Sequence, residues 1–207
     1  MMRFQSTNLQ TVVGWVGRLL RLDFSVFDEI RSDPSATSAA VAVVLGASVL
    51  AGFGSWLWAL QSTDLRGVDG GTVFIRSLLL GSIIQTFVWF LWVYLSYQVL
   101  VRAYGARADF AELTRTMGFA FAPAGLSVLI AIMGFAVPFG VIAFVMAVLL
   151  TNAAIQHASD AEPREATMAN ITGFAAFAIV MGVFANIYEV GTFGGLAPGI
   201  FFFSLDL

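Results

Sequence analysis

The chain has 207 residues, of which 59% are hydrophobic and 11% are charged, whereas soluble domains are about 45–50% apolar and about 25% charged. A soluble protein of this size could not bury so much apolar surface, so the composition excludes a soluble globular domain and indicates lipid as the solvent. The formal net charge of −3 is too small to indicate a nucleic-acid partner. The chain has no cysteine and no lysine, which excludes disulfides, thiolate metal sites, Schiff-base lysines and P-loop lysines.

The first predicted element is an amphipathic helix over residues 8–31 that does not span the bilayer. Small or polar residues recur at every third or fourth position, and apolar residues cover the other side. Trp15 lies at the edge of the apolar side, and Arg18 and Arg21 lie on the polar side, which is typical of a helix in the headgroup plane. Packing of this helix along the protein's own bundle is the alternative, and the sequence does not decide between the two.

Five long, charge-poor segments follow, each near the ~20 residues that a helix needs to cross a ~30 Å hydrocarbon core. Residues 116–159 contain no charged residue, so this interval can cross twice, and the Gly and Pro residues of 134–140 supply the turn. The predicted fold is all-α: a polytopic membrane protein with a five-transmembrane-helix bundle, preceded by the amphipathic interfacial helix. The predicted spans, within a domain of residues 36–188, are 37–60, 76–101, 116–133, 138–157 and 167–188.

The third predicted span has the most distinctive local pattern. Asp109 and Glu112 form a D-x-x-E capping arrangement that starts the helix. Arg115 closes the polar turn, after which the helix enters lipid. Pro123 lies inside the span, where it removes a backbone donor and is expected to bend the helix.

Arginine counts predict the orientation. Eight of the ten arginines fall in the N-terminal segment and in the links after the second and fourth spans, and only Arg66 and Arg76 fall on the other side. The positive-inside rule therefore places the N-terminal segment 1–35 in the cytoplasm. It places residues 189–207 outside as a short tail, in which 200–203 is apolar enough to dip into the membrane interface.

Charged side chains are absent from the interior of the predicted spans, so polar side chains are the functional candidates there. Asn152 and Gln156 are four residues apart and share a helix face. These side chains can act as interhelical hydrogen-bond donors and acceptors, or they can line a polar path. The full set comprises Gln85, Asn152, Gln156, Asn170 and Asn186.

His157 is the only histidine, and it lies at the predicted cytoplasmic end of the fourth span. A neutral imidazole there could ligate a haem iron or a chlorophyll magnesium, and a solvated helix-end histidine beside Ser159 and Asp160 is the simpler interpretation. No membrane-embedded acid or base offers a proton relay. The sequence therefore predicts no enzyme, no metal site and no cofactor other than lipid contacts, with haem or chlorophyll at His157 as an alternative.

Two stretches carry a resemblance to a known family: FDEIRSDPSATSAAVAVV (27–44) and DFAELTRTMGFAFAPAGL (109–126). With five predicted spans and a cytoplasmic N-terminus, they resemble the Yip family, the Ypt/Rab-interacting membrane proteins, and specifically its bacterial branch, over roughly residues 20–188. In eukaryotic members the family implies vesicle-traffic roles through Rab GTPases. This chain lacks their long cytoplasmic N-terminal region, so GTPase binding is not carried over. For bacterial members the resemblance implies the fold and no established activity.

The function hypothesis is a non-enzymatic protein of a bacterial cytoplasmic (inner) membrane that acts by association, as an accessory or scaffold subunit of a larger complex or as a membrane organiser. Small residues one helical turn apart, such as Ala47 with Ala51 and Ala178 with Gly182, permit close helix approach. Expected partners are membrane lipids and other integral membrane subunits. The residues expected to contact them are Trp15, Arg18, Arg21, Asp109, Glu112 and Arg115. The alternatives are a small-solute permease or channel lined by Gln85, Asn152 and Gln156, and a pigment- or haem-binding subunit.

Overall fold

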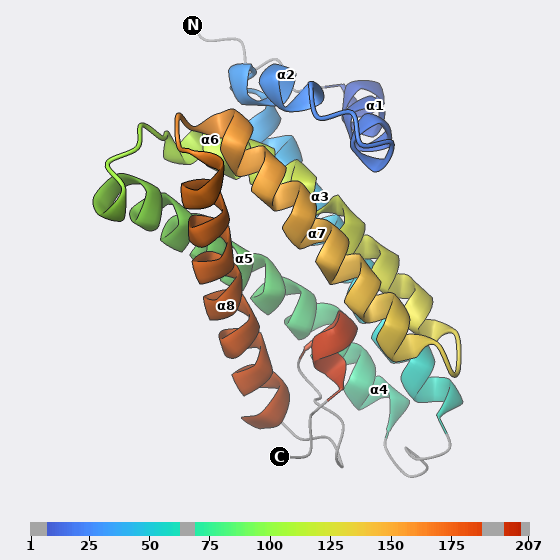
Figure 1. Cartoon of the computed structure of the whole chain (residues 1–207). Coiled ribbons are helices and arrows are strands. Elements are labelled where there is room, and N and C mark those ends of the chain that lie inside the picture. The colour runs from blue at the N-terminus through green and yellow to red at the C-terminus, as the bar shows by residue number, and fades with distance from the viewer. Residues whose placement is uncertain (1–7, 63–68, 188–196, 204–207) are drawn as a thin grey trace, which may run out of the picture. The chain divides into compact units, whose positions relative to one another are not determined.

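All regular elements are helices in the residues that the computed structural model describes, which are 8–62, 69–187 and 197–203 (Figure 1). The α-helices are α1 (Leu9–Leu20), α2 (Val26–Ser32), α3 (Ala36–Gln61), α4 (Gly70–Val73), α5 (Ser82–Gln98), α6 (Phe110–Ala120), α7 (Ala136–Ala158) and α8 (Pro163–Ile187). The π-helices are η1 (Phe74–Gly81) and η2 (Val99–Ala103), and the 3₁₀-helices are η3 (Ala122–Ala131) and η4 (Gly199–Phe202).

Five continuous helical segments are long and apolar enough to cross a membrane, and they match the five predicted spans. Their bounds are Ala36–Gln61, Gly70–Ala103, Phe110–Ala131, Ala136–Ala158 and Pro163–Asn186. The predicted all-α, polytopic fold is therefore confirmed, and the chain is a multi-pass integral membrane protein. Parts of the predicted N-terminal segment, fifth span and tail (1–7, 188, 189–196 and 204–207) lie outside the described residues.

The N-terminal segment contains two helices, so the prediction of one continuous helix over 8–31 is wrong. α1 ends at Leu20, and Leu22 has a positive φ of 63°, which breaks a right-handed helix. Asp23 Oδ1 then accepts hydrogen bonds from the N–H (3.2 Å) and the Oγ–H (2.6 Å) of Ser25. Short polar side chains compete with helical hydrogen bonds in this way, and α2 begins immediately afterwards at Val26.

The third span changes its helix type at the predicted proline. α6 begins at its N-cap Asp109, whose side chain accepts from the Glu112 N–H (2.9 Å), as the capping pattern predicts. α6 ends at Ala120, and the 3₁₀-helix η3 follows from Ala122, so Pro123 lies in its first turn. Proline has no N–H to donate to the carbonyl four residues earlier, which is consistent with a change of helix type at this point. This span is 78% buried, against 33–44% for the other four, so it is the most enclosed of the five.

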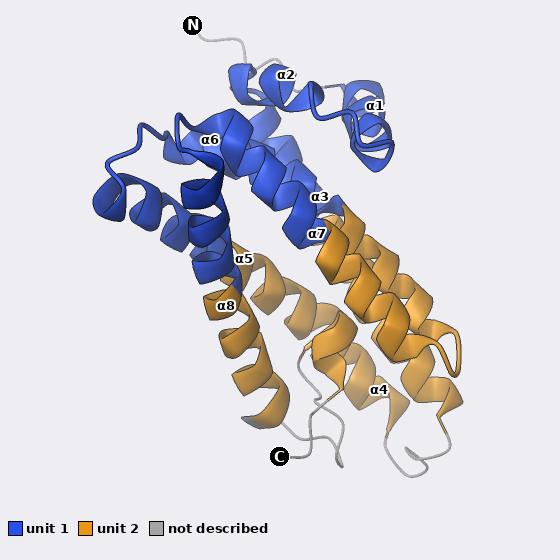
Figure 2. Cartoon of the chain, in the orientation of Figure 1, with its two compact units in different colours: residues 1–44, 90–122, 147–174 blue, residues 45–89, 123–146, 175–207 orange. Residues whose placement is uncertain are grey.

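The chain divides into two compact units (Figure 2). Unit 1 comprises 1–44, 90–122 and 147–174, and unit 2 comprises 45–89, 123–146 and 175–207. Unit 1 therefore gathers α1, α2 and one end of each of the five spans, the ends that an alternating topology brings to one side. In its core, Trp92 packs against Phe174 with ring centroids 5.1 Å apart.

In unit 2, small residues allow close backbone contact between helices. A Cβ added to Gly54 of α3 would lie 2.6 Å from the carbonyl oxygen of Ser127 and 2.7 Å from Cα of Val128 in η3. A Cβ added to Gly125 of η3 would lie 3.5 Å from Cα of Ala47, one of the small residues noted in the sequence. Close helix approach through these residues is thus achieved within the protein itself.

The described part of the C-terminal segment packs inside unit 2. Gly199 has a positive φ of 64°, and its N–H donates to Ser55 Oγ of α3 (3.0 Å). Phe202 is 1% exposed and packs with Ala59 and Val73. The expectation that 200–203 dips into the membrane interface is therefore wrong for Phe202, because the aromatic side chain is buried against the protein's own helices.

Candidate association site on unit 1

α1 is attached to unit 1 through Trp15 and Arg18. Trp15 is 7% exposed; its ring packs edge-on against Phe119 of α6 at a centroid distance of 5.3 Å, and its Nε1–H donates to Glu29 Oε2 (3.2 Å). Arg18 Nη1 donates to Glu29 Oε1 of α2 (2.7 Å). Both side chains contact α2 or α6 of unit 1, and the contact with a partner or the bilayer that was predicted for them stays a prediction. Arg21, the third predicted contact in this segment, is exposed.

The carboxylates around Arg18 are held in their charged form. Hydrogen bonds from Ser25 and then from Arg18 lower the pKa of Asp23, and the Arg18 hydrogen bond lowers the pKa of Glu29. Hydrogen bonds to Glu29 and Asp23 in turn raise the pKa of Arg18. Exposed ion pairs of this kind stabilise weakly one by one, but here they close the turn between α1 and α2.

Arg115 is the last charge before the uncharged interval, and it is 8% exposed. Its Nε and Nη2 both donate to the main-chain carbonyl of Arg31 (3.1 and 2.6 Å), and its Nη1 donates to Thr37 Oγ1 (3.4 Å). No carboxylate of a described residue pairs with it. The Arg31 carbonyl lies in the last turn of α2, where a cation is favourable. Arg115 therefore fastens α2 and the start of α3 to α6, and the partner contact predicted for it is made within unit 1.

Arg31 repeats this arrangement at the end of α7. Its Nη1 donates to the main-chain carbonyl of His157 (2.6 Å). Asp28 Oδ1 lies 3.7 Å from Arg31 Nε and 3.6 Å from His157 Nδ1, and the His157 ring lies 5.8 Å from the ring of Phe27. His157 is thus a helix-end histidine held beside a carboxylate, and its role as a haem or chlorophyll ligand stays a prediction.

An open cavity of about 590 Å³ lies beside this cluster, where the links after η2 and α7 meet. Ala108 and Ser159 form an antiparallel β-bridge, the Arg107 N–H donates to Asp160 Oδ1 (2.5 Å), and the Asp160 N–H donates to the Arg107 carbonyl (3.2 Å). Side chains of both charges and apolar side chains line the cavity. The charged lining residues are Arg31, Arg107, Asp109, Glu112 and Asp160, and the others are Tyr97, Val101, Ala106, Ala108, Ala158 and Ser159.

Several polar groups of the cavity already take part in hydrogen bonds of the fold. Asp109 and Asp160 accept backbone hydrogen bonds, and Ser159 Oγ donates to a main-chain carbonyl of α7 (2.8 Å) and faces no base. Among the described residues, no group of three or more His, Asp or Glu could hold a metal ion. Arg107 and Glu112 remain to form ion pairs with a partner that carries both charges.

The predicted intramembrane polar residues occupy different settings. Gln85 Nε2 donates to Ser48 Oγ (3.2 Å), and its Oε1 is buried without a hydrogen-bond partner. Asn152 Oδ1 is likewise buried without a partner, whereas Gln156 is exposed. Gln85 belongs to unit 2 and the other two to unit 1, so a common polar lining stays a prediction.

Asn170 supports the hydrogen-bonding interpretation of such residues. Its Oδ1 accepts from the Trp92 Nε1–H (3.1 Å), and its Nδ2 donates to the Val148 carbonyl (2.9 Å). It thereby links α8 to α5 and α7 within unit 1. Asn186, in contrast, donates to the carbonyl of Gly182 on its own helix (2.9 Å), and this is its one side-chain hydrogen bond to a described residue.

The sequence analysis missed Arg31, Arg107 and Asp160 as site residues. It used the arginines only to assign orientation. The topology itself contained a usable signal, because alternation places the links after the second and fourth spans on the same side, where Arg107 and Asp160 can meet.

No protein-family model, curated protein or solved structure matches the chain. The resemblance of 27–44 and 109–126 to the Yip family is therefore a prediction from the residues alone. Functional conclusions rest on the geometry of unit 1.

Proposed function

We propose that the chain is a non-enzymatic subunit that acts by association, as an accessory or scaffold component of a larger complex in a bacterial cytoplasmic membrane. Its N-terminal segment and unit 1 then face the cytoplasm, as the arginine distribution predicts. We also propose the bacterial branch of the Yip family as its family, on the residues 27–44 and 109–126. No GTPase partner is included in this proposal.

The observation that supports association best is the mixed-charge cavity of unit 1. It is open, charged and apolar residues both line it, and the lining residues Arg107 and Glu112 form no ion pair with another described residue. Charges arranged in this way give a partner its orientation and its specificity. A short polar loop of another membrane subunit, carrying one acid and one base, fits this surface.

The test is extraction of the full chain from its native membrane in a mild detergent, followed by identification of the proteins that remain bound. Glu112→Arg reverses a charge that lines the cavity, and Glu162→Arg reverses an exposed charge on the link after α7 that does not line it. We expect stoichiometric partners with the wild-type and Glu162→Arg chains and their loss with Glu112→Arg. A wild-type chain that elutes alone, or partners that remain with both variants, would contradict the proposal.

A permease or channel is the second candidate, and the buried, unpartnered Oδ1 of Asn152 is the observation that favours it. A buried polar atom without a partner is costly unless water or a solute reaches it. Liposomes containing the purified chain would be tested for urea and glycerol entry by light scattering. Entry that Asn152→Leu abolishes would support this function, and no entry above that of empty liposomes would exclude it for these solutes.

A further inference from the structure

α1 carries an exposed apolar ridge that nothing in the described structure covers. The ridge consists of Leu9, Val13 and Leu20, whose exposed fractions are 74%, 63% and 47%. These positions share one face of the helix, because they are separated by four and seven residues. Trp15 and Leu19 lie on the adjacent face and are buried. The helix thus uses one apolar face to attach to unit 1 and leaves a second one open.

The depth of α1 follows from its contact with α6. Trp15 packs against Phe119, which lies four residues beyond Arg115. At a rise of 1.5 Å per residue, Phe119 is about 6 Å further along α6 than the last charge before the uncharged interval. α1 therefore lies at the level where the apolar part of a membrane span begins. Interfacial helices bury their apolar face about 5–10 Å into this boundary.

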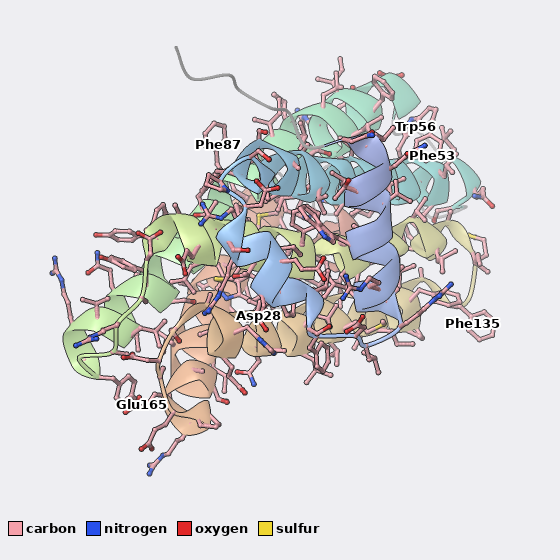
Figure 3. All side chains as sticks on the ribbon, turned by 90° about the horizontal axis from the view of Figure 1, so that it is seen from above. Asp28, Phe53, Trp56, Phe87, Phe135 and Glu165 are labelled. Carbon is pink, nitrogen blue, oxygen red and sulfur yellow. The ribbon has the colours of Figure 1, made fainter. Side chains whose placement is uncertain are left out.

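The direction and the charge of α1 agree with this position. In Figure 1, α1 runs almost along the line of sight, whereas α7 runs across the picture. In Figure 3, α1 is seen lengthwise. Within unit 1 it therefore lies crosswise to the end of α7. Arg18 pairs with both Asp23 and Glu29, so this arginine has counter-charges from the protein itself at the membrane surface.

We infer that the apolar ridge inserts into the bilayer, so that α1 is an in-plane anchor in the leaflet nearest unit 1. The occupant of the ridge is the upper acyl region of the phospholipids that surround the protein's own spans. Burial of three aliphatic side chains in this region supplies the driving force. This inference does not depend on the proposed function, because lipid surrounds the chain whether or not it has a protein partner.

The absence of cysteine from the chain allows a direct test with single labels. Cysteine would be introduced at Leu9 or Val13 on the ridge, and at Gln10 or Thr11 as exposed, matched controls on the polar side of α1. Each full-length variant would carry an environment-sensitive fluorophore in phosphatidylcholine–phosphatidylglycerol nanodiscs. Quenching would be measured with lipids that carry a nitroxide near the top of the acyl chain, and with iodide in the water.

If the ridge is inserted, lipid nitroxide quenches the labels at Leu9→Cys and Val13→Cys at least about threefold more than those at Gln10→Cys and Thr11→Cys. Iodide shows the opposite order. Two results would overturn the inference. One is iodide access to all four labels, which would place the ridge in water. The other is protection of the ridge labels from both quenchers, which would place it against a protein, in a second copy of the chain or in a partner.

Discussion

Replacing Arg115 tests whether arginine side chains that donate to carbonyls near helix ends hold the helices of unit 1 together. In Arg115→Met the side chain keeps most of its volume, but the Arg31 carbonyl loses two charged donors and Thr37 Oγ1 loses one. A hydrogen bond from a charged group contributes about 1.5–3 kcal/mol, and a buried acceptor left unpaired costs about 1–3 kcal/mol. Two of the three bonds converge on one oxygen and are not additive, and relief from burying a charge offsets part of the loss. We expect a net destabilisation of about 2–3 kcal/mol.

The assay is thermal unfolding of the full chain in detergent micelles, followed by tryptophan fluorescence. At about 2–4 °C per kcal/mol for a chain of this size, the midpoint falls by about 5–10 °C. Arg164→Met removes an exposed arginine in the first turn of α8 and serves as the control. Arg115→Lys retains the charge but cannot donate from two nitrogens to the Arg31 carbonyl in the same way. We therefore expect its melting midpoint to lie between those of Arg115→Met and Arg164→Met. An Arg115→Met midpoint equal to that of Arg164→Met would refute the capping role.

Two further predictions test packing and electrostatics separately. Gly54→Ala places a Cβ against backbone atoms of η3 and should destabilise unit 2 by about 1–3 kcal/mol. Gly46 lies on the same helix, and a Cβ added there has no neighbouring atom within 4 Å, so Gly46→Ala should be neutral or stabilising. Equal melting midpoints for the two variants would contradict this prediction. The carboxyls of Glu29 and Asp23 have ordinary pKa values of 4.5 and 3.8 that are lowered in the folded chain, so their stabilisation is complete above those values and is lost as the pH falls through the lower folded ones. A spin label on α1 should therefore be immobile at pH 7 and gain mobility as the pH falls through the lowered pKa values of the two carboxyls, and a label whose mobility does not change on acidification would show that α1 does not depend on their ion pairs with Arg18.

The five spans could be predicted because each depends on the length of an uncharged interval, which can be read directly from the sequence. Intervals without charge are long enough to cross the hydrocarbon region, and the boundaries are charged or capped positions such as Asp109. Local chemistry also predicted the point at which the third span changes, since Pro123 cannot donate a backbone hydrogen bond.

The contacts of individual side chains could not be predicted in the same way. Trp15 and Arg18 are residue types that are common on helices at the membrane surface, but in the structure both attach α1 to unit 1. Hydrophobic periodicity shows that a helix has an apolar side, but it does not show which part of that side meets protein and which part meets lipid. The break at Leu22 was missed for a related reason, because the competing hydrogen bonds of Asp23 are a local detail inside an otherwise regular pattern.

The packed segment 197–203 was missed because its partners are distant in sequence. Its Gly and Pro residues predicted no further span, and its aromatic residues suggested the membrane interface. The positive φ of Gly199 and the acceptor Ser55, 144 residues earlier in the chain, fix the segment in unit 2. Neither residue indicates the other without the fold.

The described charges of unit 1 fall into two groups, and this division locates the surface available for function. Arg115, Arg31 and Arg18 donate to carbonyls or pair with carboxylates of unit 1, so they are committed to holding α2, α6 and α7 together. Arg107 and Glu112 line the open cavity and have side chains that the fold does not use in this way. Substitutions in the first group should lower stability and association together, whereas Glu112→Arg should abolish association and lower stability only by the about 0.3–1 kcal/mol that an acidic residue in the first turn of α6 supplies. That separation distinguishes a surface that recognises a partner from one that only completes the fold.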